Sequence, residues 1–168
     1  MEYNVKSTED VMWSNELVDI KQLKVNVDDR GDLFEIVRTD MLPDGADIKQ
    51  VYAIENHQVG TIRAYHKHNK LIDYFCIVKG AAIFVFWKTL KTGSSTTTLY
   101  QRVVVDERAP VMITVPANIW HGWMSLKQET MLISVASACY DKDNPDEVRT
   151  TPDALDRFLP NIWEITKK

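Results

Sequence analysis

Short runs of β-branched and aromatic residues, separated at close spacing by turn signals, constrain the fold of this 168-residue chain more than any other feature. They predict strands over 18–27, 33–37, 48–55, 61–65, 71–78, 81–88, 99–106, 111–115 and 131–137. The run over 81–88 is apolar throughout, so we expect a strand buried on both faces, followed by a polar loop over 89–98. Many short strands with close turns are typical of an all-β sandwich or barrel. Because the chain has no linker or repeat, we predict a single β-barrel domain over 1–168.

The two ends of the chain depart from this pattern. We expect residues 1–18 to form an N-terminal arm, with a short helix as one option over 7–17. After residue 141 the chain becomes polar, so 141–168 is predicted to be a C-terminal tail that carries a short helix over 152–159. Turns are expected over 28–32 and 42–45.

Composition excludes several classes of partner. The net charge of −4 provides no basic surface for nucleic acid. No apolar run is long enough to span a bilayer, and the N-terminus lacks the layout of a signal peptide, so we expect no membrane partner. Cys76 and Cys139 lie far apart in apolar runs, which predicts buried free thiols and a cytoplasmic location.

The candidate chemistry is concentrated around two histidines of one predicted strand, His66 and His68. Side chains two residues apart in a strand point to the same face, so both imidazoles share a face and Tyr65 points to the other. A regular strand would also place Ala64 with the histidines and Arg63 on the opposite face. Two imidazoles on one face can act as a proton-transfer pair or as metal ligands.

A third histidine, His121, follows a turn at Pro116. Together the two stretches resemble the two motifs of the cupin superfamily, a group of jelly-roll β-barrels. The first motif is matched by Gly60, His66, His68 and Gly80, with Asp73 in the place of the usual Glu. The second motif is matched by Pro116 and His121.

Within the cupins, the chain resembles the nucleotide-sugar branch, which contains the dTDP-4-dehydrorhamnose 3,5-epimerases and the dTDP-4-keto-6-deoxyhexose 3,4-ketoisomerases. The segments that carry this resemblance are 29–35, 60–66, 70–71 and 115–123. It implies a nucleotide-diphosphate sugar as substrate, proton abstraction next to its keto group, no cofactor, and a homodimer that exchanges an N-terminal strand.

The resemblance also implies residue roles. His66 would be the general base, His68 would assist it, and Lys70 would stabilise the enolate oxygen. The residues that would bind substrate are Arg30, Arg63, Tyr65, His121 and Trp123. Trp123 is the best aromatic candidate to stack on the ligand, although tryptophans of this kind are more often part of the core.

The chain departs from the epimerase pattern at the general acid. Ser134 stands where those enzymes carry a catalytic tyrosine, and their C-terminal Asp partner of the base is missing. Tyr52, Tyr65 and Tyr140 are the candidate substitutes, and Tyr140 is the one included in the predicted catalytic set.

Two other classes of function stay open. In a metal-dependent cupin, either a dioxygenase or an isomerase, a divalent transition metal would be held by His66, His68, Asp73 and His121. The short Asp73 and the nearby cations Lys70 and Arg63 argue against this, and Asp73 is equally expected to pair with one of those cations. The third option is a non-catalytic sugar-binding cupin.

Overall fold

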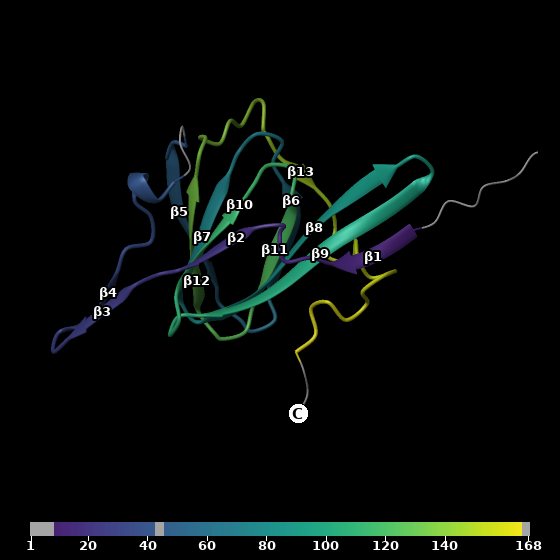
Figure 1. Ribbon diagram of the computed structural model, residues 1–168. Helices are drawn as coiled ribbons and strands as arrows, with labels where there is room; N and C mark the ends of the chain where they lie inside the picture. The colour runs from purple at the N-terminus through teal and green to yellow at the C-terminus, as the bar shows by residue number, and fades with distance from the viewer. Residues whose placement is uncertain (1–8, 43–45, 166–168) are drawn as a thin grey trace, which may run out of the picture.

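The computed structural model describes residues 9–42 and 46–165, which form two large β-sheets and a separate hairpin (Figure 1). The elements are β1 (Glu9–Trp13), β2 (Asp19–Gln22), β3 (Val25–Asp28), β4 (Gly31–Phe34), the 3-10 turn η1 (Thr39–Met41), β5 (Gln50–Asn56), β6 (Ile62–Lys67), β7 (Asp73–Lys79), β8 (Ala81–Thr92), β9 (Ser95–Asp106), β10 (Val111–Val115), β11 (Trp120–Ser125), β12 (Thr130–Ala136) and β13 (Val148–Arg149). One sheet has the order β1-β9-β8-β11-β6-β13 and the other β2-β10-β7-β12-β5. The predicted all-β jelly roll is confirmed.

The main core lies between the two sheets. Phe75 on β7 stacks on Phe84 on β8 with ring centroids 6.0 Å apart, and Trp123 on β11 also stacks on Phe84. The alternate residues of β8, Ile83 and Val85, pack in a second cluster beneath the C-terminal tail. Strand β8 is therefore covered on both faces over its first half, as its apolar sequence predicts.

The predicted loop over 89–98 is wrong. Strands β8 and β9 form one long hairpin whose pairing continues to Thr92 and Ser95, with Gly93 in the turn at a φ of +60°. The segment is rich in threonine, and β-branched residues favour strands even where the residues are polar. This hairpin also provides an edge for β1, which pairs parallel to β9 where an arm or helix was the expectation.

The helix predicted over 152–159 is also wrong. Here Pro152 and Pro160 bracket a series of turns closed by short-range bonds such as Phe158 N–H to Leu155 C=O. Burial stabilises this irregular segment, because Leu155 and Ile162 pack against Tyr65 on the outer face of β6. Apart from η1, the described residues contain no helix.

Other predictions have mixed outcomes. The turn over 28–32 is confirmed in the β3–β4 hairpin, which projects from the body of the barrel in Figure 1. The predicted turn over 42–45 lies largely outside the described residues. Cys76 is buried as expected, but Cys139 is exposed because it follows the end of β12. Among the described residues, no helix is long and apolar enough to cross a bilayer.

Candidate functional site

Side chains from both sheets converge where β6 ends and β7 begins. His66 lies on β6, and His68 is the first residue after that strand. Asp73 is the first residue of β7, and His121 lies on β11. One nitrogen or oxygen atom from each of these four side chains lies within 4.8 Å of the other three. The predicted histidine face is therefore confirmed, and the cluster contains all four residues of the predicted metal-ligand set.

Strand β6 carries one extra residue opposite β11, and this bulge changes which side chains share the histidine face. His121 pairs with His66, whereas Trp123, two residues further, pairs with Arg63, three residues back. Paired residues of antiparallel strands point to the same side of a sheet, so Arg63 lies on the histidine side. The prediction that Ala64 faces the histidines and Arg63 faces away is wrong, because β6 is not a regular strand.

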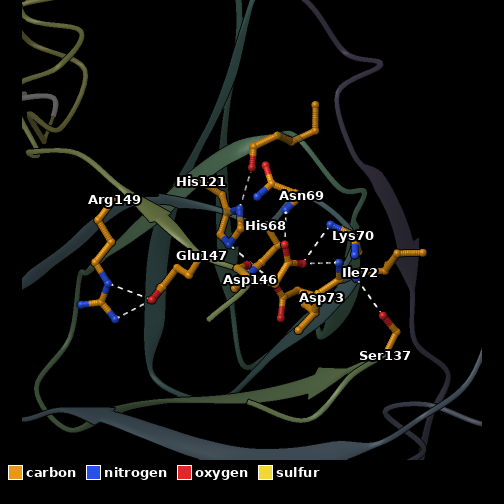
Figure 2. A network of polar contacts seen from close by, with 12 residues as sticks. His68, Asn69, Lys70, Ile72, Asp73, His121, Ser137, Asp146, Glu147 and Arg149 are labelled. Atoms are coloured by element: carbon orange, nitrogen blue, oxygen red, sulfur yellow. Dashed lines mark hydrogen bonds and ion pairs between the residues drawn. The ribbon is translucent and has the colours of Figure 1, made fainter. Parts of the chain in front are cut away.

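Backbone carbonyl groups orient two of the imidazoles. His121 Nδ1 lies 2.9 Å from the carbonyl oxygen of Ile119, and His68 Nδ1 lies 2.5 Å from that of Asp146. Because a carbonyl oxygen can only accept, each Nδ1 must carry the proton and donate it. The Nε2 atoms of both rings then point toward Asp73, as Figure 2 shows.

Asp73 lies between these imidazoles. Its Oδ2 atom is 3.4 Å from His68 Nε2 and 3.6 Å from His121 Nε2. Burial raises the pKa of Asp73 to about 6, lowers the pKa of His66 to about 4, and lowers the pKa of His121 well below its usual value. At neutral pH, the Asp73 carboxyl group is therefore ionised, and the imidazoles of His66 and His121 are neutral. The expected pairing of Asp73 with Lys70 or Arg63 is wrong.

The tail fixes the loop that follows His68. The Asp146 carboxylate accepts backbone N–H groups from Asn69, Lys70 and Leu71 at 2.9 to 3.1 Å, while its carbonyl group accepts the His68 Nδ1 proton (Figure 2). Sequence analysis missed this role. The sequence pattern around Asp146 gives little indication of this role, because the residue lies in a polar tail far from His68 in the chain.

Two cavities open beside the cluster. The first, which we call the histidine cavity, has a volume of about 310 Å³ and is lined by Tyr52, His66, His68, Asp73, Tyr140 and other residues. The second, the arginine cavity, has a volume of about 410 Å³ and is lined by Arg63, Trp123 and others. Both are bordered by Tyr52, His66, Glu147 and Arg149, so the two cavities are neighbours. An ion pair at 2.9 Å joins Glu147 and Arg149. The sequence does not predict these two residues as part of the site, because the two-residue strand β13 leaves no recognisable pattern.

Two predicted site residues, Lys70 and Arg30, lie outside both cavities, and a third, Tyr65, turns its ring away from the site. Lys70 is exposed and lines neither cavity, and its backbone N–H donates to the Asp146 carboxylate at 2.9 Å. Arg30 lies in the projecting β3–β4 hairpin and forms an exposed ion pair with Asp28. Tyr65 is among the residues that line the arginine cavity, but its ring packs between Trp87 and Trp163 on the outer face of β6.

The other predicted residues do meet at the site. Tyr140 is 63% exposed at the rim of the histidine cavity, and Arg63 lines the arginine cavity. Trp123 is a core residue, 4% exposed, whose remaining surface borders the arginine cavity. His121 is buried beside His66, with ring centroids 4.1 Å apart, and lines neither cavity.

Comparisons with known proteins identify the family of this chain. Residues 15–158 match the family model described as dTDP-4-dehydrorhamnose 3,5-epimerase. The "Probable low-salt glycan biosynthesis epimerase Agl13" of Haloferax volcanii is 31% identical over 134 residues, which cover 79% of this chain and 85% of that protein.

Solved structures share the fold. The 3'-monoepimerase ChmJ from Streptomyces bikiniensis superposes with a TM-score of 0.72 at 20% identity, covering 88% of this chain and 73% of ChmJ. The 3,4-ketoisomerase QdtA from Thermoanaerobacterium thermosaccharolyticum gives a TM-score of 0.65 at 23% identity, covering 87% of this chain and all of QdtA, 100%. The extent of the family match and the Agl13 identity decide the assignment, and this chain belongs to the dTDP-4-dehydrorhamnose 3,5-epimerase family.

Proposed function

We propose that this chain is an epimerase of a dTDP-4-keto-6-deoxyhexose and that His66 removes the proton next to the keto group. The observation that carries the proposal is the position of His66, which borders both cavities and is neutral at pH 7 because burial lowers its pKa to about 4. A neutral imidazole is the form that a general base requires. The family to which the chain belongs consists of isomerases of this kind.

The arginine cavity is the proposed site of the nucleotide diphosphate. Arg63 donates its Nε hydrogen to Asn56 Oδ1 at 2.7 Å, and Asn56 is in turn held by the Thr61 carbonyl group. Among residues 9–42 and 46–165, neither terminal nitrogen of the guanidinium group forms a hydrogen bond, so both can bind phosphate oxygens. The ligands in the ChmJ and QdtA structures, dTDP-quinovose and TDP, support a thymidine nucleotide.

The proposed general acid is Tyr52. Its side chain borders both cavities, and its position on β5 is directly opposite Ser134, where the epimerases carry their tyrosine. Burial raises the pKa of Tyr52, so the hydroxyl group keeps the proton that an acid must donate. Tyr140, the acid predicted from sequence, lies at the exposed rim and is the alternative.

Ketoisomerisation at the same site is a second candidate. His68 stands beside His66, with ring centroids 5.4 Å apart, and could move a proton between neighbouring carbons of the sugar. Both reactions begin with the same proton abstraction, so only the product separates them.

Two further expectations belong to this proposal. The projecting β3–β4 hairpin supports a homodimer, and a partner copy could bring Arg30 to the site. Free Cys76 and Cys139 support the reducing cytoplasm as the location. Light scattering of the purified chain should give twice its mass of 19.4 kDa.

The test is solvent exchange. The chain is incubated with dTDP-4-keto-6-deoxyglucose in D₂O, and deuterium at the carbons next to the keto group is followed by NMR spectroscopy. We expect deuterium uptake by the wild type and by His57→Gln, an exposed histidine in a loop, but not by His66→Gln. If dTDP binds but the wild type takes up no deuterium, the chain is a binding protein and the proposal fails.

A further inference from the structure

Ser134 on β12 carries a buried hydroxyl group next to the proposed general acid. The residue is 0% exposed, and its Oγ atom has no hydrogen-bond partner within residues 9–42 and 46–165. An unsatisfied buried hydroxyl group has an unfavourable free energy, and buried polar groups are normally paired. The neighbours of Ser134 therefore indicate what its hydroxyl group does.

The strand register places Ser134 between two polar side chains of the site. Tyr52 on β5 is paired directly with Ser134. Asp73 on β7 is paired with Ala136, which lies two residues from Ser134 on the same strand. Paired residues of antiparallel strands point to the same side of a sheet, as do residues two apart in one strand. Tyr52, Ser134 and Asp73 consequently share one face of the sheet, with the serine on the middle strand.

The Ser134 hydroxyl group is close enough to influence both neighbours. Burial raises the pKa of Tyr52, and the nearby Ser134 side chain opposes that increase. Burial also raises the pKa of Asp73 to about 6, and Ser134 is one of the groups that oppose this increase. A hydroxyl group has this effect by approaching the ionised oxygen as a donor. Ser134 is thus near both oxygens, although neither contact has the geometry of a complete hydrogen bond.

We propose that Ser134 is the positioning residue that holds the Tyr52 hydroxyl group for proton donation. A serine hydroxyl group can accept one hydrogen bond while it donates another. The Tyr52 O–H donates to Ser134 Oγ, and the Ser134 O–H donates to the Asp73 carboxylate, which only accepts. Small rotations about the side-chain bonds complete both contacts. The chain of hydrogen bonds fixes the phenol ring beside His66, where both cavities meet Tyr52.

The same hydroxyl group also serves Tyr52 after its proton has left. Tyr52 gives its O–H proton to the sugar carbon from which His66 removed one, and the electron pair of the enolate forms the new C–H bond. The Ser134 O–H then turns from Asp73 to the phenolate oxygen, and no covalent bond of the serine breaks. Solvent returns a proton to Tyr52, which is 39% exposed. This role rests on the proposed function, whereas the contact between Ser134 and Tyr52 is independent of it.

The contact is tested by NMR spectroscopy, which requires no activity. The full chain is labelled with carbon-13 at the Cζ atom of its 6 tyrosines, and the Tyr52 signal is assigned by its loss in Tyr52→Phe. A hydrogen bond to a phenol oxygen changes the chemical shift of this carbon, so Ser134→Ala should move the Tyr52 signal. Thr98→Val, which removes a buried hydroxyl group from the β8–β9 hairpin, should leave it unchanged. An identical Tyr52 signal in the wild type and Ser134→Ala overturns the proposal, whether or not the chain is active.

The effect on the reaction is tested by kinetics with the keto-sugar substrate. Loss of one hydrogen bond corresponds to about 2–12-fold in rate, so Ser134→Ala should lower kcat for epimer formation by that factor. The KM and the rate of deuterium uptake should not change, because neither depends on the acid. In a Tyr52→Phe background, Ser134→Ala should have no further effect on epimer formation, since the oxygen that it serves is absent.

Equal losses in the two backgrounds would overturn the positioning role and leave the proposed function intact. A different result separates the two ideas in the other direction. If the wild type takes up no deuterium but the Tyr52 signal moves in Ser134→Ala, the proposed function fails while the contact between Ser134 and Tyr52 is supported.

Discussion

Gly122 on β11 packs so closely against Ala64 on β6 that an added Cβ atom would lie 2.3 Å from the Cβ atom of Ala64. The same atom would lie 2.8 Å from the carbonyl oxygen of Arg63. The contact occurs at the bulge that brings Arg63 and His66 onto the same side of β6. The missing side chain of Gly122 therefore allows β11 and β6 to approach closely beside the site.

Gly122→Ala should lower the free energy of unfolding by about 1–3 kcal/mol, as overpacking does in well-packed interiors. It should also weaken dTDP binding, because the displaced β6 backbone carries Arg63. Urea unfolding and a dTDP-dependent thermal shift would measure the two effects. Adding Ala64→Gly should restore part of the stability, since the closest contact disappears while the backbone contacts at 2.8 Å remain. A Gly122→Ala chain as stable as the wild type would contradict this account.

Asp146 should matter more for stability than its place in a polar tail suggests. Asp146→Ala removes the acceptor of three backbone N–H groups and loosens the loop that carries His68. We expect a loss of about 1–3 kcal/mol in urea unfolding, because three hydrogen bonds to a charged carboxylate are lost and water replaces them only in part. Asp143→Ala is the matched control, since that neighbouring exposed side chain forms no hydrogen bond with described residues. Equal losses in the two variants would show that Asp146 has no special role.

Much of this fold could be predicted because strand burial leaves a local pattern. The apolar run of β8 and the spacing of His66, His68 and Asp73 depend on neighbours in the sequence. The β6 bulge could not be predicted, because it depends on the register with β11. The position of the Lys70 side chain could not be predicted either, since it depends on Asp146, 76 residues away. The tail illustrates the same limit, as the packing of Leu155 overrides its local helix preference.

Arg63 should control nucleotide affinity. Hydrogen bonds to charged groups contribute about 1.5–3 kcal/mol, which corresponds to about 10–100-fold in affinity. Arg63→Ala should therefore raise the Kd for dTDP by that factor, as measured by titration calorimetry. Arg63→Lys should recover little, because Lys cannot both bond to Asn56 and present a planar pair of donors. Arg108→Ala, which removes an exposed guanidinium group paired with Asp106, should leave the Kd unchanged.

Asp106 should make stability weakly dependent on pH. Its hydrogen bonds with Arg108, and secondarily with Lys127, hold the pKa of this carboxyl group below its usual value. The folded state thus binds the proton less tightly than the unfolded state, so this contribution is present above about pH 4 and is lost as pH falls further. Because the pairs are near the surface, Asp106→Asn should remove at most about 1 kcal/mol at pH 7. The deficit should disappear at low pH in urea unfolding, and a deficit that persists there would reject the ion-pair explanation.

Tyr52 and Tyr140 can be separated by the products that their variants form. If Tyr52 is the general acid, Tyr52→Phe should reduce epimer formation by about 100-fold or more, the usual contribution of a positioned acid. Deuterium uptake should persist, because His66 still removes the proton and can return a deuteron to the same face of the sugar. Tyr140→Phe removes a matched hydroxyl group at the exposed rim. It should change the rates of epimer formation and of deuterium uptake less than threefold, which corresponds to about 0.7 kcal/mol in activation free energy. NMR spectroscopy in D₂O reports epimer and exchange in one sample. The opposite result, with exchange uncoupled from inversion only in Tyr140→Phe, would assign the acid to Tyr140.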